Sequence, residues 1–72
     1  MFRSKISLIL EERGISTYTL AEKSGVSRQS IFKARQDEGI SECRLSTLGR
    51  IAKALEVGTK ELYEETSKEG GL

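Results

Sequence analysis

At 72 residues the chain has room for one hydrophobic core, and no apolar run reaches the roughly 18 residues of a membrane span, which predicts one soluble domain. It has no histidine and one cysteine, so we expect neither an enzyme nor a metal or other cofactor, and the lone thiol fits a reducing cytoplasm. The net charge is only +1, but residues 1–35 carry seven Lys or Arg against three Glu, whereas residues 36–72 carry five against eight Asp or Glu, so a polyanion is expected to bind the first half.

The first predicted helix runs over residues 4–13. Ser4 has a side chain suited to the N-cap, and Gly14 can adopt the left-handed conformation that ends a helix. Apolar residues recur along this segment at helical spacing. The face predicted to enter the core consists of Phe2, Ile6, Ile9 and the stem of Arg13.

Two further short helices are predicted directly after the first. One covers residues 17–24 with Ser16 as its N-cap, and the next covers residues 28–36 with Ser27 in the same role. Gly25 is expected to stop the first of the two. The side chains expected to face the core are Leu20, Ala21, Ile31 and Ala34.

The second half is predicted to hold an exposed loop and two more helices. Residues 37–43 combine acidic residues with glycine and serine and show no periodicity, which is typical of a loop. An apolar stripe predicts a helix over residues 45–55, and Thr59 is placed to cap a short helix over residues 60–66. The result is an all-α, five-helix domain over residues 1–66, followed by a tail over residues 67–72 that is expected to be flexible. The stripe consists of Leu45, Leu48, Ile51, Ala52 and Leu55.

Residues 17–34 have the pattern of two short helices joined by a tight turn. Gly25 can take a positive φ in that turn, and Ala21 is small where the two helices approach. Val26 and Ile31 are expected to bury the corner. In such an arrangement one helix braces across the DNA backbone while the other enters the major groove, which is wide enough for an α-helix.

Several segments occur together at a recurring spacing, namely Leu20-Ala21-Glu22-Lys23, Gly25-Val26-Ser27-Arg28, Ile51-Ala52-Lys53-Ala54-Leu55 and Glu61-Leu62-Tyr63. In these segments the sequence resembles the Cro and phage-repressor (Xre-type) helix-turn-helix family over residues 6–63. The resemblance implies a compact, lambda-repressor-like DNA-binding domain with its helix-turn-helix at the second and third helices. It also implies double-stranded DNA as the partner.

The resemblance places the base-reading residues on the third helix. Arg28 can chelate guanine and Gln29 can pair with adenine, each good bidentate contact discriminating by about 1–3 kcal/mol. Lys33 can reach guanine or a phosphate. Hydrogen bonds to phosphates, which set register rather than sequence, are expected from Thr17, Ser27, Ser30 and Gln36.

Phe32, on the same outer face, has three open interpretations. It can contact a thymine methyl group, pack into the core, or anchor a protein partner, because exposed aromatic residues are frequent hot spots. Leu10 is open in the same way. It either rests on the stem of Arg35 or joins Leu8 and Tyr63 as a candidate dimer or partner contact.

Three features depart from the pattern of the family that the sequence resembles. Thr17 stands where an amide side chain is frequent, and it reaches less far toward a phosphate. Leu10 and Arg35 stand where many members pair a basic residue with a glutamate, so that ion pair cannot form. The predicted loop after the third helix is longer than usual, and its acidic residues repel a DNA backbone.

Two functions follow as alternatives. The first is a sequence-specific transcription regulator of phage or bacterial type, which binds two half-sites as a homodimer because one small module makes few base contacts. The second is a protein of the same fold that binds another regulator, as a repressor modulator or antirepressor, rather than DNA. The weak net charge, the acidic loop and Phe32 favour this second function.

Overall fold

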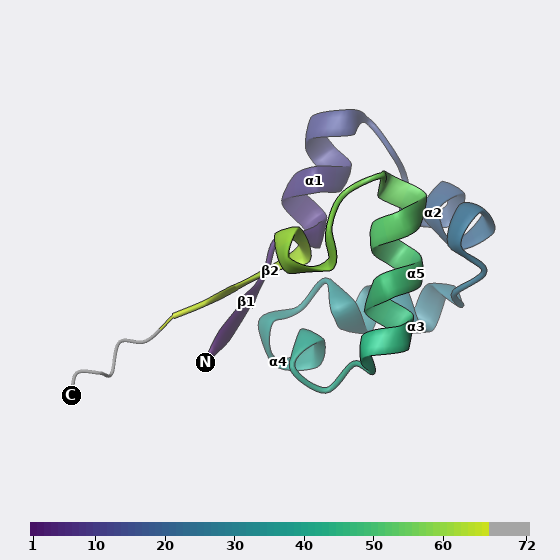
Figure 1. Cartoon of the computed structure of the whole chain (residues 1–72). Coiled ribbons are helices and arrows are strands. Elements are labelled where there is room, and N and C mark those ends of the chain that lie inside the picture. The colour runs from purple at the N-terminus through teal and green to yellow at the C-terminus, as the bar shows by residue number, and fades with distance from the viewer. Residues whose placement is uncertain (67–72) are drawn as a thin grey trace.

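The helix-turn-helix part of the chain folds from local signals in its sequence. In the computed structural model, which describes residues 1–66, α1 spans Ile6–Arg13, α2 spans Thr17–Ser24 and α3 spans Arg28–Ala34. The predicted bounds of α2 are confirmed, whereas α1 begins two residues later and α3 ends two residues earlier than predicted. The predicted flexible tail lies outside the described residues. Figure 1 shows α2 and α3 on the side of the molecule away from the first residues of the chain.

Serine caps fix the starts of α2 and α3. The Ser16 Oγ accepts a hydrogen bond from the Thr19 N–H at 3.0 Å, and the Ser27 Oγ accepts one from the Ser30 N–H at 3.1 Å. Each cap of this kind contributes about 1 kcal/mol. Between the two helices Gly25 adopts φ 73°, a left-handed conformation without steric cost for glycine, so α2 stops there and the chain turns into α3.

The start of the chain pairs with a segment that lies far along the sequence. β1 (Phe2–Ser4) and β2 (Tyr63–Glu65) form an antiparallel ribbon in which Arg3 lies opposite Glu64. The N-cap of α1 is Lys5, not Ser4 as predicted, although the Ser4 Oγ accepts the Ile6 N–H at 3.4 Å. The Ser4 hydroxyl donates a hydrogen bond to the Ala34 carbonyl at 2.6 Å, which ties the ribbon to the end of α3.

The segment after α3 is a single helical turn rather than the predicted open loop. α4 spans Asp37–Ile40, and Ile40 is buried, which anchors the turn to the core. The acidic residues that suggested a loop occupy the first turn of α4, where negative charge favours a helix. The Asp37 carboxylate also accepts the Ser4 N–H at 2.9 Å.

The end of the described chain also differs from the prediction. α5 (Leu45–Leu55) has the predicted bounds, but the predicted helix over residues 60–66 is wrong. A 3-10 turn, η1 (Thr59–Leu62), leads directly into β2, because pairing with β1 satisfies the main-chain groups that a helix would otherwise satisfy. The N-cap of η1 is Gly58, not Thr59 as expected.

The core gathers the apolar faces of all the helices. α5 supplies the predicted stripe, except that Leu45 is 74% exposed in its first turn. Burying one such aliphatic side chain contributes about 1.5–3 kcal/mol, so α5 is a main source of stability. The buried residues are Ile6, Leu10, Leu20, Val26, Ile31, Ala34, Ile40, Leu48, Ile51, Ala52, Leu55 and Leu62.

The face of α1 that enters the core includes Leu10 and excludes Arg13, which differs from the predicted face. Ile6 is fully buried, and Phe2 and Ile9 are half-buried against the core. Arg13 is exposed, and its guanidinium donates to a main-chain carbonyl at the end of α5. Leu10, whose role was open, is 3% exposed and belongs to the core.

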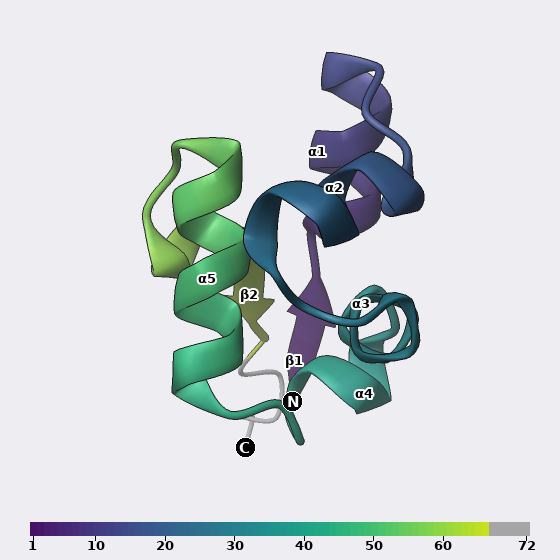
Figure 2. The same ribbon diagram turned by 90° about the vertical axis from the view of Figure 1, so that its right-hand side faces the viewer.

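Packing leaves the outer sides of α2 and α3 uncovered. α5 packs on α2 and η1, whereas α4 packs on α3 and β1. Figure 2 views α3 along its axis, with α2 crossing beside it and α5 on the far side of α2. Within residues 1–66, none of the helices has the length and apolar character needed to cross a membrane.

Candidate nucleic-acid interface

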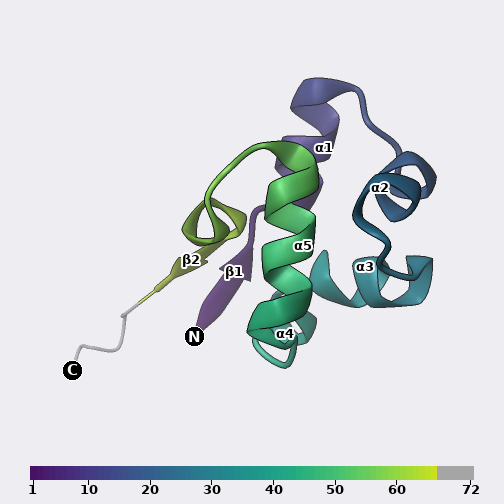
Figure 3. The ribbon, with the colours of Figure 1, turned by 45° about the vertical axis from the view of Figure 1, so that its right-hand side comes forward.

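α3 presents its polar side chains outward as a continuous surface. Its inward residues, Ile31 and Ala34, are fully buried, and this fixes the rotation of the helix. Residues at positions i, i+1, i+4 and i+5 share a helix face, so the four predicted base-reading residues lie together on the side away from the core. All four are exposed: Arg28, Gln29, Phe32 and Lys33. Figure 3 shows α3 at the edge of the molecule below α2.

Arg28 is held by an aromatic ring from the neighbouring helix. Its guanidinium carbon lies 5.0 Å from the centre of the Tyr18 ring, a cation–π distance. Tyr18 is an exposed residue in the first turn of α2, and the sequence interpretation did not include it in the site. Its position directly after Thr17, a predicted phosphate contact, was the available signal. The ring limits the positions open to Arg28 before any ligand arrives.

The two serines at the start of α3 form a hydroxyl pair. Besides accepting from the Ser30 main chain, Ser27 donates its own hydroxyl hydrogen to the Ser30 Oγ at 3.0 Å. The proton of the Ser30 hydroxyl then remains for another acceptor. Both predicted phosphate contacts are therefore brought together at one end of the α3 surface.

Lys33 is paired with an acidic residue that follows α4. Its ammonium nitrogen lies 3.4 Å from a carboxylate oxygen of Glu42, and the two side chains are 52% and 69% exposed. An ion pair this exposed contributes at most about 1 kcal/mol, so Lys33 can exchange Glu42 for a phosphate at small cost. Glu42 still places a negative charge beside the outer face of α3.

Cys43, directly after Glu42, is half-buried behind this ion pair. Burial raises the pKa of its thiol above the ordinary value of 9.0; Lys33 opposes that shift and Glu42 adds to it. The thiol donates a hydrogen bond to the Gly39 carbonyl at 3.4 Å. A protonated, hydrogen-bonded thiol is a poor nucleophile.

The start of α5 adds a second group that the sequence interpretation did not include. Arg44 is exposed at the N-cap, and no side chain caps the free N–H groups of the first turn. These groups border a polar hollow that also reaches α3, and a helix N-terminus favours an anion. A basic residue directly before a predicted helix was the signal for this group. The hollow is lined by Ser30, Lys33, Glu42, Cys43, Arg44 and Thr47.

Two predicted phosphate contacts lie at the other end of α3. Thr17 is the first residue of α2, and its Oγ1 accepts a hydrogen bond from Arg35 Nη1 at 2.7 Å. Gln36 does not continue α3 as expected. It adopts an extended conformation at φ −102° and ψ 145° as the N-cap of α4, so its exposed side chain leaves the α3 surface.

The predicted partner contacts are not all available to a partner. Leu10 as a dimer or partner contact is wrong, because its side chain is buried in the core. Leu8 is 51% exposed and Phe32 is 52% exposed, which rules out a core position for Phe32. Tyr63 is half-buried, with its ring edge-on to that of Phe2 at 5.7 Å.

A comparison with protein-family models supports the assignment of this surface. Residues 5–66 match the Cro/C1-type HTH DNA-binding domain, a span that includes α1 to α5, η1 and β2. Neither the comparison with curated proteins nor the comparison with solved structures found a match. The match covers most of the chain. The helix-turn-helix and the outward polar face of α3 both lie within the matched residues. The chain therefore belongs to the family of Cro/C1-type helix-turn-helix DNA-binding domains.

Proposed function

We propose that this protein is a sequence-specific transcription regulator of phage or bacterial type, in which α3 reads base edges in the major groove of DNA. The observation that carries the proposal is the outer face of α3, where base-reading chemistry is exposed and flanked at both ends by hydrogen-bond donors for phosphates. A groove about 12 Å wide admits such a helix. The DNA-binding family supplies the ligand class, and the side chains of α3 supply the specificity.

Specificity is assigned to the first turn of α3. Arg28 has the forked guanidinium that matches guanine O6 and N7, and Gln29 has the amide that matches adenine N6 and N7. Tyr18 restrains Arg28 before binding, which reduces the conformational entropy lost in the complex. Phe32 continues the same face and can contact a thymine methyl group.

Affinity is assigned to groups at the two ends of this face. Thr17 and the Ser27–Ser30 pair are hydroxyl donors, whereas Lys33 and Arg44 are cations. Contacts of these types hold the phosphate backbone and fix the register of α3 without reading sequence. Each neutralised phosphate releases counterions, so binding should weaken steeply as salt is raised.

We propose a homodimer as the DNA-binding form. One helix supplies few base contacts, and two half-sites one helical turn apart give the discrimination that a genome requires. The ribbon offers one candidate contact. In the ribbon, the Lys5 N–H donates to the Leu62 carbonyl and the Thr66 N–H donates to the Met1 carbonyl, both at 2.8 Å. Because hydrogen-bonded and non-hydrogen-bonded pairs alternate in an antiparallel ribbon, Tyr63 lies in a non-hydrogen-bonded pair with Ser4. The N–H and carbonyl groups of Tyr63 therefore point away from β1, toward the open edge of the ribbon.

The test is fluorescence anisotropy with random-sequence and genomic upstream duplexes at two salt concentrations, with the mass of the complex measured by light scattering. We expect tight, salt-sensitive binding of a dimer to a particular sequence. Arg28→Ala should weaken that binding and relax the preference at one base pair, at a cost of about 1–3 kcal/mol. Lys60→Ala, a loss of the same charge from exposed η1, is the matched control. Equal affinity for all duplexes would contradict sequence-specific regulation.

A specific observation also favours the alternative of a protein that binds another regulator. Phe32 and Leu8 are both half-exposed apolar side chains, and a hydrogen bond from Arg35 to Ser7 holds the end of α3 beside α1, which carries Leu8. Exposed apolar side chains on two neighbouring helices suit a protein partner. Under this alternative, Phe32→Ala abolishes capture of the partner while Arg28→Ala leaves it intact.

A further inference from the structure

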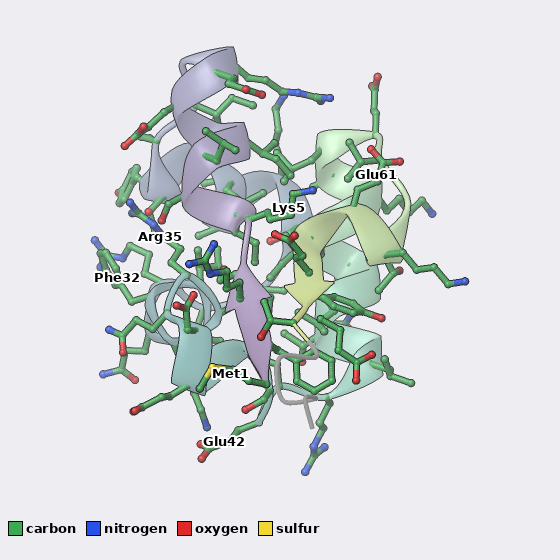
Figure 4. The ribbon with its side chains drawn as sticks, turned by 90° about the vertical axis from the view of Figure 1, so that its left-hand side faces the viewer. Met1, Lys5, Phe32, Arg35, Glu42 and Glu61 are labelled. Carbon is green, nitrogen blue, oxygen red and sulfur yellow. The ribbon has the colours of Figure 1, made fainter. Side chains whose placement is uncertain are left out.

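Arg35 joins the three helices of the helix-turn-helix region through one side chain. It lies directly after α3, and its Nε donates to the Ser7 Oγ of α1 at 2.8 Å. Its Nη1 donates to the Thr17 Oγ1 of α2 at 2.7 Å. The side chain is only partly exposed, so these contacts hold the guanidinium in place. Figure 4 shows Arg35 and Phe32 at the same edge of the molecule.

The direction of these hydrogen bonds determines where the Thr17 proton can go. A guanidinium has N–H donors and no acceptor, so Thr17 must accept from Arg35 and cannot donate back to it. Within residues 1–66, the Thr17 hydroxyl has no protein acceptor. Its proton is therefore left for an acceptor outside the chain, and the same argument holds for Ser7.

The charge of Arg35 is also left without a counter-charge. Both of its hydrogen-bond partners are neutral hydroxyls, and in the described part of the chain the ion pair within 4.0 Å joins Lys33 to Glu42 instead. A fixed positive charge beside a free hydroxyl proton is suited to an oxygen anion such as a phosphate.

We infer that Arg35 is a positioning residue for the phosphate contact of Thr17. It directs the Thr17 hydroxyl proton toward a DNA phosphate and places a fixed positive charge behind that hydroxyl. The threonine reaches less far than an amide, and the charge of Arg35 offsets that shorter reach. The inference rests on the proposed binding of DNA through α2 and α3. It concerns affinity for the backbone, so it holds for DNA of any sequence.

The first experiment measures binding to a random-sequence duplex by anisotropy between about 50 and 200 mM salt. Arg35→Gln should lower the affinity about tenfold at the low-salt end and reduce the slope of log K against log salt by about one. Lys60→Gln, which removes one positive charge from exposed η1, should leave the slope near that of the wild type. A residue that only braced the helices would lower the melting temperature and leave the slope unchanged.

The second experiment separates orientation from charge. Thr17→Val should weaken binding roughly fivefold in the wild type, as expected for the loss of one hydrogen bond. Arg35→Lys retains the charge but not the two-pronged hold. In the Arg35→Lys background, Thr17→Val should therefore cost less than about twofold, because contacting residues give non-additive effects. If thermal melting shows that Arg35→Gln does not fold, the comparison of Thr17→Val in the wild type and in the Arg35→Lys background still tests the role of Arg35.

The outcomes distinguish the two proposals. If the folded wild-type protein binds no duplex, DNA binding and the role of Arg35 both fail. If the wild type binds, equal affinities and slopes for Arg35→Gln and Lys60→Gln overturn the role of Arg35 and leave DNA binding standing. An unchanged effect of Thr17→Val in the Arg35→Lys background also overturns it.

Discussion

The outer surface of α3 depends on side chains that restrain one another before DNA is present. Tyr18 lies against Arg28, and Ser27 caps α3 and bonds Ser30. None of these contacts is strong, because each is exposed to water. Together they reduce the number of rotamers that binding must select, and this lowers the entropic cost of forming base contacts.

The ring of Tyr18 should contribute to DNA affinity through Arg28. Tyr18→Leu removes the cation–π contact and should weaken binding to the preferred duplex by about 0.5–1 kcal/mol, whereas Tyr18→Phe keeps the ring and should bind like the wild type. Anisotropy titration measures both. In an Arg28→Ala background the two Tyr18 variants should bind equally, and a remaining difference would show that Tyr18 acts independently of Arg28.

The thiol of Cys43 should react slowly in the folded protein. Burial raises its pKa above 9.0, so less thiolate is present than in the unfolded chain, and alkylation at about pH 8 should speed up when urea unfolds the protein. Because the folded state favours the protonated thiol, stability should fall as pH rises above about 9 and level off above the folded pKa. Equal alkylation rates with and without urea would contradict this prediction.

At the scale of elements, the packing of α4 against α3 requires a glycine. A Cβ on Gly39 would overlap the main-chain carbonyl of Lys33, so α4 approaches the last turn of α3 closely just behind a residue of the DNA-facing surface. Gly49, in the middle of α5, has nothing within 4 Å of such an atom. The fold therefore does not need a glycine at position 49, because a side chain there would meet open space.

These two glycines should respond oppositely to alanine. Gly39→Ala should destabilise the fold by more than about 2 kcal/mol, because a clash with main-chain atoms cannot be relieved by a side-chain rotation. Gly49→Ala should stabilise it by about 0.5–1 kcal/mol, since alanine is the better helix former. Urea denaturation of both variants gives the comparison. A stabilised Gly39→Ala would mean that α4 packs less closely than described.

The elements predicted from the sequence are those with local causes. Serine caps and Gly25 set α2, and apolar periodicity sets α5, so both have their predicted bounds. The ribbon was missed because three-residue strands carry no period and their pairing depends on distant contacts. In the site, the exposure of the α3 residues follows from helical spacing. The contacts of Tyr18 and Arg35 arise only when separate helices pack together.

At the scale of the whole molecule, the division of charge along the sequence is not a division in space. The basic residues of α3 lie beside acids that follow them, and Glu42 reaches Lys33 at 3.4 Å. A DNA backbone that approaches this side meets attraction from α3 and repulsion from the chain between α4 and α5. The net charge of +1 is a sum over the whole chain and does not describe this surface. A single substitution of a charged residue beside α3 should therefore change DNA binding strongly.

Removing one of these acids should strengthen DNA binding. Glu42→Gln frees Lys33 and removes a negative charge beside the phosphates, so affinity for a random-sequence duplex should rise several-fold at low salt. Glu65→Gln, the same change on exposed β2, is the control and should have a smaller effect. The measurement is anisotropy at low and high salt. Weaker binding by Glu42→Gln would mean that Glu42 orients Lys33 rather than competing for it.

The ribbon has a consequence for the order in which the protein forms during synthesis. Among residues 1–66, β1 is made before all the helices, yet its partner strand β2 is the last element made. The side chain of Leu62, fully buried in the core, arrives at the same late stage. A nascent chain can therefore form its helix-turn-helix early but keeps one side of its core open. Until β2 emerges, that unfinished side is exposed to proteases and chaperones, and pairing with β1 ends the exposure.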